Sequence, residues 1–181
     1  IVSGFHTDPV GLLLSHRADW AIVSEVEHND DVIFKPLFSY EMVGICSKNH
    51  SLAEKDIWEA EDFIDETWVT YPVPDDMLDL WRKVLKSKGI NPTRRTTELT
   101  IAMIELVASK RGIATVPYWA ALPYLEKGYV VARKITKSGL YSNLYAAIRK
   151  EDESLSYLED FYQTVKSQSF STLPGLSVLN L

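Results

Sequence analysis

The sequence predicts an α/β fold with doubly wound, partly mixed sheets, and two observations support this prediction. Short apolar runs of strand length alternate with segments whose apolar residues recur at helical spacing. Residues 105–121 add a compact example, in which a helix end, a glycine, a short apolar strand and a second helix start follow one another without a long loop. Such alternation is typical of crossover units in an open sheet.

The first predicted helix and strand lie near the start of the chain. Thr7 or Asp8 before Pro9 forms a helix-start pattern, a capping residue followed by proline, and the helix continues over residues 10–17. Residues 19–25 are nearly all apolar, so we expect a strand that is covered on both faces. With a strand end expected just before the helix, these segments predict a parallel crossover unit.

Residues 32–47 predict two further strands. Their apolar runs are bent around residues 39–41, a pattern typical of a hairpin or a pair of edge strands, so the sheet is expected to be mixed there. A polar stretch with a short helix follows over residues 48–66. The strand expected at residues 67–72 then begins a second set of alternating units.

The second set contains three predicted helices before the end of the chain. One runs from Asp75 to Gly89, with acidic residues in its first turn and glycine at its end. A short strand then leads into a helix capped by Thr96 or Thr97, and Pro117 is expected to open a third helix. The remaining elements are strands at residues 129–135 and 142–150 and an amphipathic helix at residues 158–170.

Composition limits the class of protein. The chain has 181 residues, 46% of them hydrophobic, and no apolar run of the roughly 20 residues that a membrane span needs, so we expect a soluble globular protein. A single cysteine favours the reducing cytoplasm. A net charge of -6 argues against a nucleic-acid-binding surface on this chain, because phosphate contacts need clustered lysine and arginine.

No catalytic or metal-binding motif is found. The chain lacks a glycine-rich phosphate loop, a G-x-S-x-G elbow and a C-x-x-C pair, and its four histidines lack the H-E-x-x-H spacing. Cys46 and His50 are four residues apart on a strand that leads into a loop, where they do not converge on a metal. We therefore expect no enzyme activity, no cofactor and no metal, and we expect Cys46 to pack as a small apolar group.

Candidate ligand contacts are expected where strands end and helices begin, because in open α/β sheets these places share one crevice. They are Gly4, Phe5, His6, Ser24, Glu25, Tyr71, Pro72, Thr97, Glu98, Leu99, Thr100, Pro117, Tyr118 and Trp119. The helix N–H groups at residues 97–100 suit a carboxylate, and Glu25 suits an ammonium group. Aromatic rings among the candidates suit an apolar or sulfur-bearing chain. The set therefore predicts a small zwitterion.

Each of these residue types also has an ordinary structural role. Helix capping accounts for Thr97, and a helix start accounts for Pro117. Packing in the core or between subdomains accounts for Tyr118 and Trp119. His6 could form hydrogen bonds with backbone groups at a strand end, and Glu25 could be solvated. From the sequence alone, both interpretations stay open.

Three stretches resemble the effector-binding domain of LysR-type transcriptional regulators. They are SGFHTDPVGLLLSHRADWAIVSE, SKNHSLAEKD and MIELVASKRGIATVPYWA. Together with LYAAIRK they are most similar to the branch of that family that regulates methionine biosynthesis in bacteria. The resemblance spans almost the whole chain.

The resemblance implies a periplasmic-binding-protein-like fold (type II) with two doubly wound subdomains, each with a mixed sheet, joined by two crossing strands. Subdomain I would take residues 1–46 and 146–181, and subdomain II residues 47–145. Compared with the family, the chain is expected to lack the first strand and first helix of the domain, as well as the N-terminal DNA-binding domain.

The resemblance also implies a function and partners. The domain would bind a small-molecule effector, homocysteine, in the cleft between its subdomains, and form a homodimer or homotetramer in the cytoplasm. DNA would be bound only through the missing N-terminal domain, and no membrane is involved. The alternative is a stand-alone amino-acid or solute-binding module of the same fold. Residues upstream of Ile1 separate the two, because only the regulator carries a helix-turn-helix pattern there.

Overall fold

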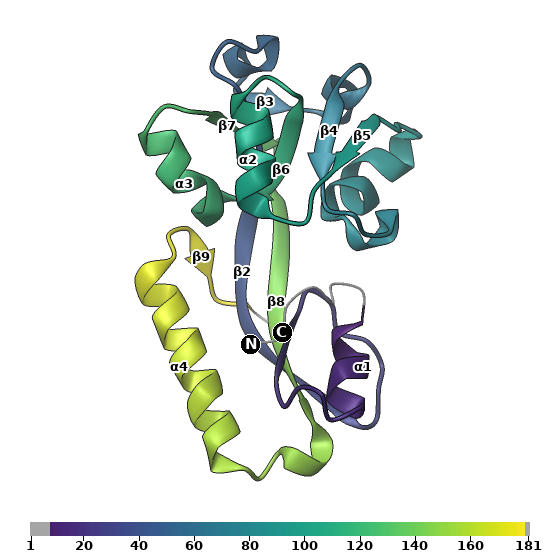
Figure 1. The fold of residues 1–181 in the computed structure, drawn as a ribbon, viewed down its shortest axis with the longest axis vertical. Coiled ribbons are helices and arrows are strands. Elements are labelled where there is room, and N and C mark those ends of the chain that lie inside the picture. The colour runs from purple at the N-terminus through teal and green to yellow at the C-terminus, as the bar shows by residue number, and fades with distance from the viewer. Residues whose placement is uncertain (1–7, 180–181) are drawn as a thin grey trace. The chain divides into compact units, whose positions relative to one another are not determined.

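The computed structural model describes residues 8–179, which form two compact units (Figure 1). Unit 1 takes the described residues up to Tyr40 and from Ser142 onward, and unit 2 runs from Glu41 to Tyr141. The chain therefore passes between the units inside two strands, β2 (Val32–Cys46) and β8 (Leu140–Arg149). Both passages come a few residues before the predicted boundaries at residues 46 and 146.

The hairpin expected around residues 39–41 is wrong, because β2 is one continuous strand of 15 residues. Ser39 and Tyr40 pair with β9 (Leu176–Ser177), and Met42 to Cys46 pair with strands of unit 2. The polar residues at the expected bend thus have ladder partners that lie far away in the sequence. Tertiary pairing overrides the local turn signal here.

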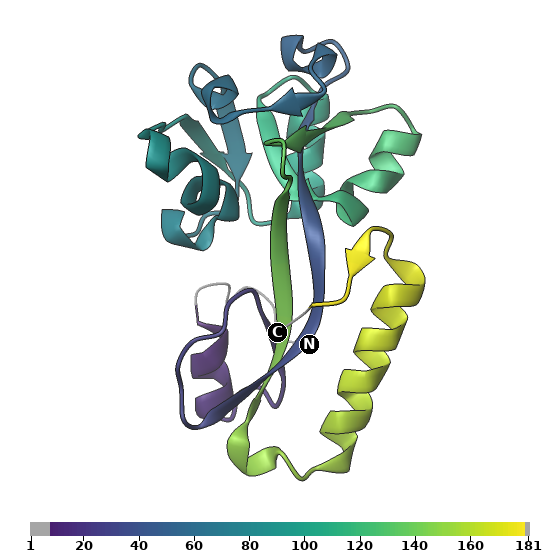
Figure 2. The same ribbon diagram turned by 180° about the vertical axis from the view of Figure 1, so that it is seen from behind.

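In unit 1, α1 (Pro9–Leu14) begins as predicted. The Asp8 carboxylate accepts a hydrogen bond from the Gly11 backbone N–H at 2.7 Å, and proline occupies the first turn. β1 (Ala21–Val23) pairs antiparallel with β8, and α1 and the C-terminal helix α4 (Ser156–Thr172) lie on either side of the β2 and β8 strands (Figure 2). Ile22 is 51% exposed, so the prediction that both faces of this strand are covered is wrong among the described residues.

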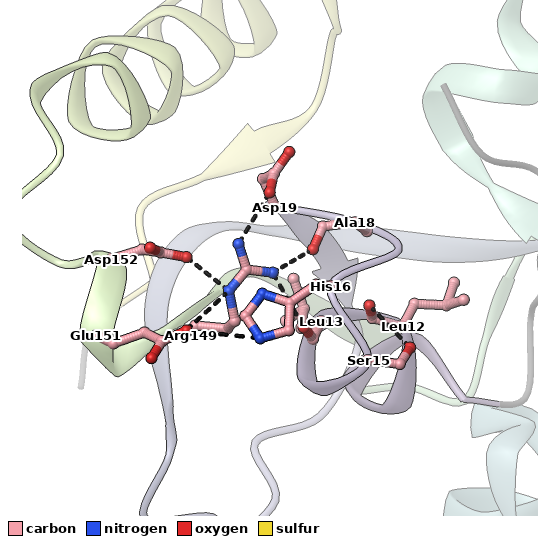
Figure 3. Close-up of polar contacts among 9 residues, drawn as sticks. All are labelled: Leu12, Leu13, Ser15, His16, Ala18, Asp19, Arg149, Glu151 and Asp152. Atoms are coloured by element: carbon pink, nitrogen blue, oxygen red, sulfur yellow. Dashed lines mark hydrogen bonds and ion pairs between the residues drawn. The ribbon is translucent and has the colours of Figure 1, made fainter.

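Arg149 anchors the end of α1 to β8 (Figure 3). Its guanidinium donates to the carbonyl oxygens of Leu13 at 3.0 Å and Ala18 at 2.6 Å. It also pairs with the carboxylates of Asp19 at 2.8 Å and Asp152 at 2.6 Å. The hydrogen bond with Asp19 raises the pKa of this buried arginine, although burial opposes the shift. A carbonyl in the last turn of α1 and one in the segment after it thereby acquire a charged donor.

Unit 2 contains a mixed sheet. β4 (Thr67–Thr70) runs parallel to β5 (Thr93–Thr96) on one side and to β6 (Ile113–Pro117) on the other. β2 lies antiparallel between β6 and β7 (Val131–Ile135), and β3 (Ile57–Trp58) extends β7 in parallel. The helices of this unit are α2 (Thr100–Ala108) and α3 (Tyr118–Glu126).

Successive residues of β4 belong to different cores of unit 2. Trp68 packs in a cluster with Trp58, Phe63 and Leu85, whereas Val69 packs in a cluster with the buried side of α2. Neighbouring side chains of a strand point to opposite faces of a sheet, so each face of β4 has its own apolar core. β4 is therefore packed against apolar side chains on both faces.

The single helix expected from Asp75 to Gly89 is wrong. Leu78 has an extended backbone (φ -98°, ψ 111°), which ends the first turn and separates it from the rest. The segment is built of η3 (Asp75–Met77), η4 (Trp81–Leu85) and η5 (Lys86–Lys88), and Gly89 ends it in the left-handed region at φ 67° as predicted. Further short helical turns are η1 (Ser51–Glu54), η2 (Ala60–Phe63) and η6 (Lys150–Asp152).

The tight joint between α2 and β6 depends on Gly112. Its φ is 141°, and a Cβ at this position would lie 2.2 Å from the carbonyl oxygen of Thr67. Only glycine allows β6 to approach β4 this closely. Within residues 8–179, none of the helices combines the length and the apolar character that crossing a membrane would require.

Candidate ligand-binding site

The carboxyl ends of β4, β5 and β6 meet at one edge of unit 2, because these three strands are parallel neighbours. Nine of the predicted residues lie at these strand ends, eight of them after a strand and Pro117 as the last residue of β6 (the strands are shown in Figure 1). We call them the ligand edge: Tyr71, Pro72, Thr97, Glu98, Leu99, Thr100, Pro117, Tyr118 and Trp119. The topology of unit 2 therefore brings these nine residues to a common edge.

A direct contact joins two parts of the ligand edge. The hydroxyl groups of Tyr71 and Thr100 lie 2.6 Å apart, and either oxygen can donate the hydrogen bond. The Thr97 backbone N–H donates to the Thr70 carbonyl at 3.0 Å, which continues the pairing of β4 and β5 beyond the strands. The loop after β4 is thus tied to the start of α2.

The start of α2 has no side-chain cap. Leu99 occupies the N-cap position, is 62% exposed and has no side-chain acceptor, so the expected capping by Thr96 or Thr97 is wrong. The reason is that Thr96 belongs to β5 and Thr97 extends the pairing with β4. Backbone N–H groups of an uncapped first turn, at the positive end of the helix dipole, form a place for an anionic group.

At the third strand end, Pro117 and the residues after it connect β6 with α3. Pro117 pairs with Met42 of β2 and occupies the N-cap position of α3. Tyr118 is partly buried and packs against the cluster around α2, and its contact with a ligand stays a prediction. Trp119 is half-buried in the first turn of α3.

The candidate residues of unit 1 stay predictions. Ser24 and Glu25 follow β1 and are exposed. Gly4, Phe5 and His6 lie outside the described residues.

Arg94 is a neighbour of the ligand edge that the sequence did not identify as functional. Its guanidinium donates to the carbonyl oxygens of Tyr71 at 3.3 Å and Val73 at 3.4 Å, and forms an ion pair with Asp75. The signal in the sequence was the Y-P-V-P run at residues 71–74, whose prolines have no N–H to donate. A backbone of this kind needs donors from outside, but the sequence does not show which residue supplies them.

A surface hollow of about 310 Å³ lies at the opposite end of α2. It is lined by Lys48, Glu105, Ala108, Ser109, Gly128 and Tyr129. These residues surround the last turn of α2 and the loop after α3, whereas the ligand edge surrounds the first turn of α2. We place the candidate site at the ligand edge, because parallel strand ends and an uncapped helix start converge there.

Cys46 and the acidic residues do not form a reactive or metal-binding centre within the described part of the chain. No group of three or more histidine, cysteine, aspartate or glutamate residues there could hold a metal ion. Burial raises the pKa of the Cys46 thiol to about 11, so the thiol is protonated at neutral pH. The side chain is fully buried, which confirms that it packs as a small apolar group.

Comparison with known proteins identifies the protein family to which the chain belongs. Residues 1–169 match the model of the LysR substrate binding domain. The chain therefore belongs to the LysR substrate-binding domain family, and it has the α/β fold of type II periplasmic-binding proteins that the sequence predicts.

Within this family the chain is similar to MetR proteins. It is 97% identical over its full length to the HTH-type transcriptional regulator MetR of Haemophilus influenzae, of which it covers 59%. The solved regulatory domain of MetR, a LysR family regulator from N. meningitidis, matches with a TM-score of 0.92 and 64% identity, over 99% of this chain and 83% of that one. These relatives are transcriptional regulators rather than enzymes.

A more distant structure shares the fold alone. The effector-binding domain of QuiR, solved in complex with shikimate, matches with a TM-score of 0.73 and 23% identity, over 92% of this chain and 79% of that one. The chain spans less than two thirds of the length of the Haemophilus relative.

Proposed function

We propose that the chain is the effector-sensing domain of a LysR-type bacterial transcriptional regulator of methionine and sulfur amino-acid metabolism, with homocysteine as its effector. Family membership and the similarity to regulators named MetR support the class of protein. The observation that carries the ligand class is the ligand edge, where an uncapped helix start lies beside the hydrogen-bonded hydroxyls of Tyr71 and Thr100.

The chemistry of homocysteine fits the predicted groups. Its carboxylate would accept hydrogen bonds from the first-turn N–H groups of α2, together with a hydroxyl such as that of Thr100. Its ammonium group needs a carboxylate, for which Glu25 is the sequence-predicted partner. Its thiol suits contact with an aromatic ring, for which Trp119 is a candidate.

The proposed mechanism is a shift between two conformations. An effector that binds one arrangement of the domain better than the other changes the population of the two. A coupling of about 1–3 kcal/mol between the effector site and DNA binding is enough for regulation. DNA would be bound by an N-terminal helix-turn-helix domain of the full-length, homo-oligomeric protein in the cytoplasm.

Calorimetry on the full-length protein tests the proposal. Homocysteine is titrated against it, with methionine and homoserine as controls that alter the sulfur end of the ligand. The proposal expects saturable heat with homocysteine and at least about tenfold weaker binding of both controls. Equal binding of all three ligands would contradict selectivity for the thiol, and no heat with any of them would remove the ligand assignment.

A further inference from the structure

We propose that Arg94 is a positioning residue of the effector site: it holds the loop of residues 71–75 in place and thereby sets the affinity for the effector. This inference rests on the proposed function, because it concerns the same ligand edge. Arg94 itself is assigned no contact with the effector, and it acts through Tyr71.

Arg94 is bound to the loop at three points. Its Nη2 lies 3.3 Å from the carbonyl oxygen of Tyr71 and 3.4 Å from that of Val73. Its Nη1 forms an ion pair with the carboxylate of Asp75. The loop is therefore contacted at alternate residues by one planar group with five N–H donors.

The position of Arg94 is itself well defined. It lies opposite Trp68 in the parallel pair of β4 and β5, and its guanidinium carbon is 5.7 Å from the centre of the Trp68 ring. Trp68 is only 1% exposed and is part of an apolar cluster of unit 2. The guanidinium thus connects the loop to a rigid part of the sheet.

The loop needs such support because of its sequence. Pro72 and Pro74 have no backbone N–H, so they cannot donate hydrogen bonds that would hold the loop. Tyr71 and Val73 each precede a proline, which restricts both to an extended backbone. In an extended segment with few donors, the carbonyls of these two residues require a partner from another element, and Arg94 provides it.

The consequence for the site follows from the Tyr71 side chain. Tyr71 carries the hydroxyl that lies 2.6 Å from Thr100, at the start of α2. If Arg94 is removed, the loop gains alternative conformations, and binding must then order it at the expense of affinity. The loss should appear in the dissociation constant even though Arg94 does not contact the effector.

Arg95 offers a matched control on the same strand. All four residues of β5 are exposed, and neighbouring side chains of a strand point to opposite faces. Across the described residues, no hydrogen bond, ion pair or ring contact of the Arg95 side chain is found. Replacing it by methionine changes the charge and the side-chain size as Arg94→Met does, but leaves the loop contacts intact.

The test measures homocysteine affinity in the full-length protein by calorimetry. Arg94→Met is expected to weaken binding about tenfold, Arg94→Lys less than that because one charged donor remains, and Arg95→Met by less than about twofold. In a double-mutant cycle with Tyr71→Phe, the two effects should be clearly non-additive, since Arg94 acts through Tyr71. Unchanged affinity in Arg94→Met, or full additivity with Tyr71→Phe, would overturn the inference.

Hydrogen exchange on the ligand-free protein separates this inference from the ligand assignment. Arg94→Met should speed up amide exchange across residues 73–78, where Met77 and Leu78 donate to backbone carbonyls of the loop end, whereas Arg95→Met should not. If the parent protein does not bind homocysteine, the ligand assignment fails and the exchange rates alone decide the role of Arg94. Identical exchange in the two variants would overturn that role.

Discussion

Lys83 joins η4 to the point where the chain leaves unit 2. Its Nζ donates to the carbonyl oxygen of Tyr141 at 2.6 Å and also pairs with Asp79 at 2.9 Å. Tyr141 is the last residue of unit 2, and Ser142 is the first residue of unit 1 after the passage. The start of β8 is thus held by a segment that follows the loop of the ligand edge.

Loss of this contact should reduce stability. Replacing Lys83 by methionine removes a charged donor from a backbone carbonyl, and we expect the free energy of unfolding to fall by about 1 kcal/mol in urea denaturation. Lys88→Met is the control, because the ion pair of Lys88 is with the exposed Glu61, at 3.4 Å, and involves no backbone carbonyl among the described residues. An equal effect of both substitutions would show that charge, rather than the Tyr141 contact, is responsible.

Replacing Arg149 should lower the free energy of unfolding more than replacing Lys83 does. Arg149→Met would remove the side-chain donor from the carbonyls of Leu13 and Ala18 and the partner from the Asp19 carboxylate, which should cost about 3 kcal/mol of unfolding free energy. The neighbouring exposed Lys150, replaced by methionine, serves as the control. Denaturation midpoints that agree between the two variants would contradict the anchoring role of Arg149.

Two glycines in left-handed or related conformations should respond differently to alanine. Gly112→Ala places a Cβ against the Thr67 carbonyl and should cost about 3 kcal/mol or more. Gly89→Ala has no atom within 4 Å of the new Cβ, so only the backbone strain at φ 67° remains, about 1 kcal/mol. Thermal unfolding of both variants measures the difference, and a Gly89 variant as unstable as the Gly112 variant would refute the steric explanation.

Burial of the Cys46 thiol should affect both the pH dependence of stability and the rate at which the thiol is alkylated. Its pKa is raised from 9.0 to about 11 by burial, so between these values the unfolded chain loses a proton that the folded chain keeps. The contribution of this group to stability should therefore be present below pH 9 and be lost as pH rises toward 11. Alkylation at pH 8 should be much slower in the folded protein than in urea, and equal rates would contradict the burial of this thiol.

Substitutions at Thr100 separate its hydroxyl from its backbone N–H. Proline is tolerated at the first position of a helix, and Leu99 already has the extended backbone that a following proline requires (φ -108°, ψ 126°). Thr100→Ala removes the hydroxyl, whereas Thr100→Pro removes the hydroxyl and the N–H. We expect homocysteine affinity to fall by about threefold to tenfold in the alanine variant and by about tenfold more in the proline variant. Equal affinities of the two variants, measured by calorimetry, would argue against an anion at the first turn of α2.

Much of the fold is visible in the sequence, because its signals are local. The cap at Asp8, the proline after it and Gly89 each act on the backbone next to them, and the structure places a helix start or end at these positions. The helix expected to run up to Gly112 ends earlier, at Ala108, and Gly112 instead allows the close approach to Thr67. The sequence misses β2 as a single strand because Ser39 pairs with a strand end more than a hundred residues away. Long-range pairing leaves no local pattern.

In the candidate site, too, the sequence reveals the local features and misses the long-range contacts. The sequence identifies the residues that follow the strand ends, and the parallel pairing of unit 2 brings nine of them to one edge. It misassigns the cap of α2, because Thr97 donates to Thr70 instead. It also misses Arg94, whose proposed role depends on a loop that lies about twenty residues earlier in the sequence. A contact across that separation leaves no helical or strand periodicity by which it could be recognised.

The measurement that tests the central claim most directly is a crystal structure of the full-length protein with homocysteine. The claim predicts the effector carboxylate at the first turn of α2, within about 3 Å of its backbone N–H groups and near the hydroxyls of Tyr71 and Thr100. Homocysteine bound instead in the hollow formed by Lys48, Glu105 and Tyr129, at the other end of α2, would contradict it.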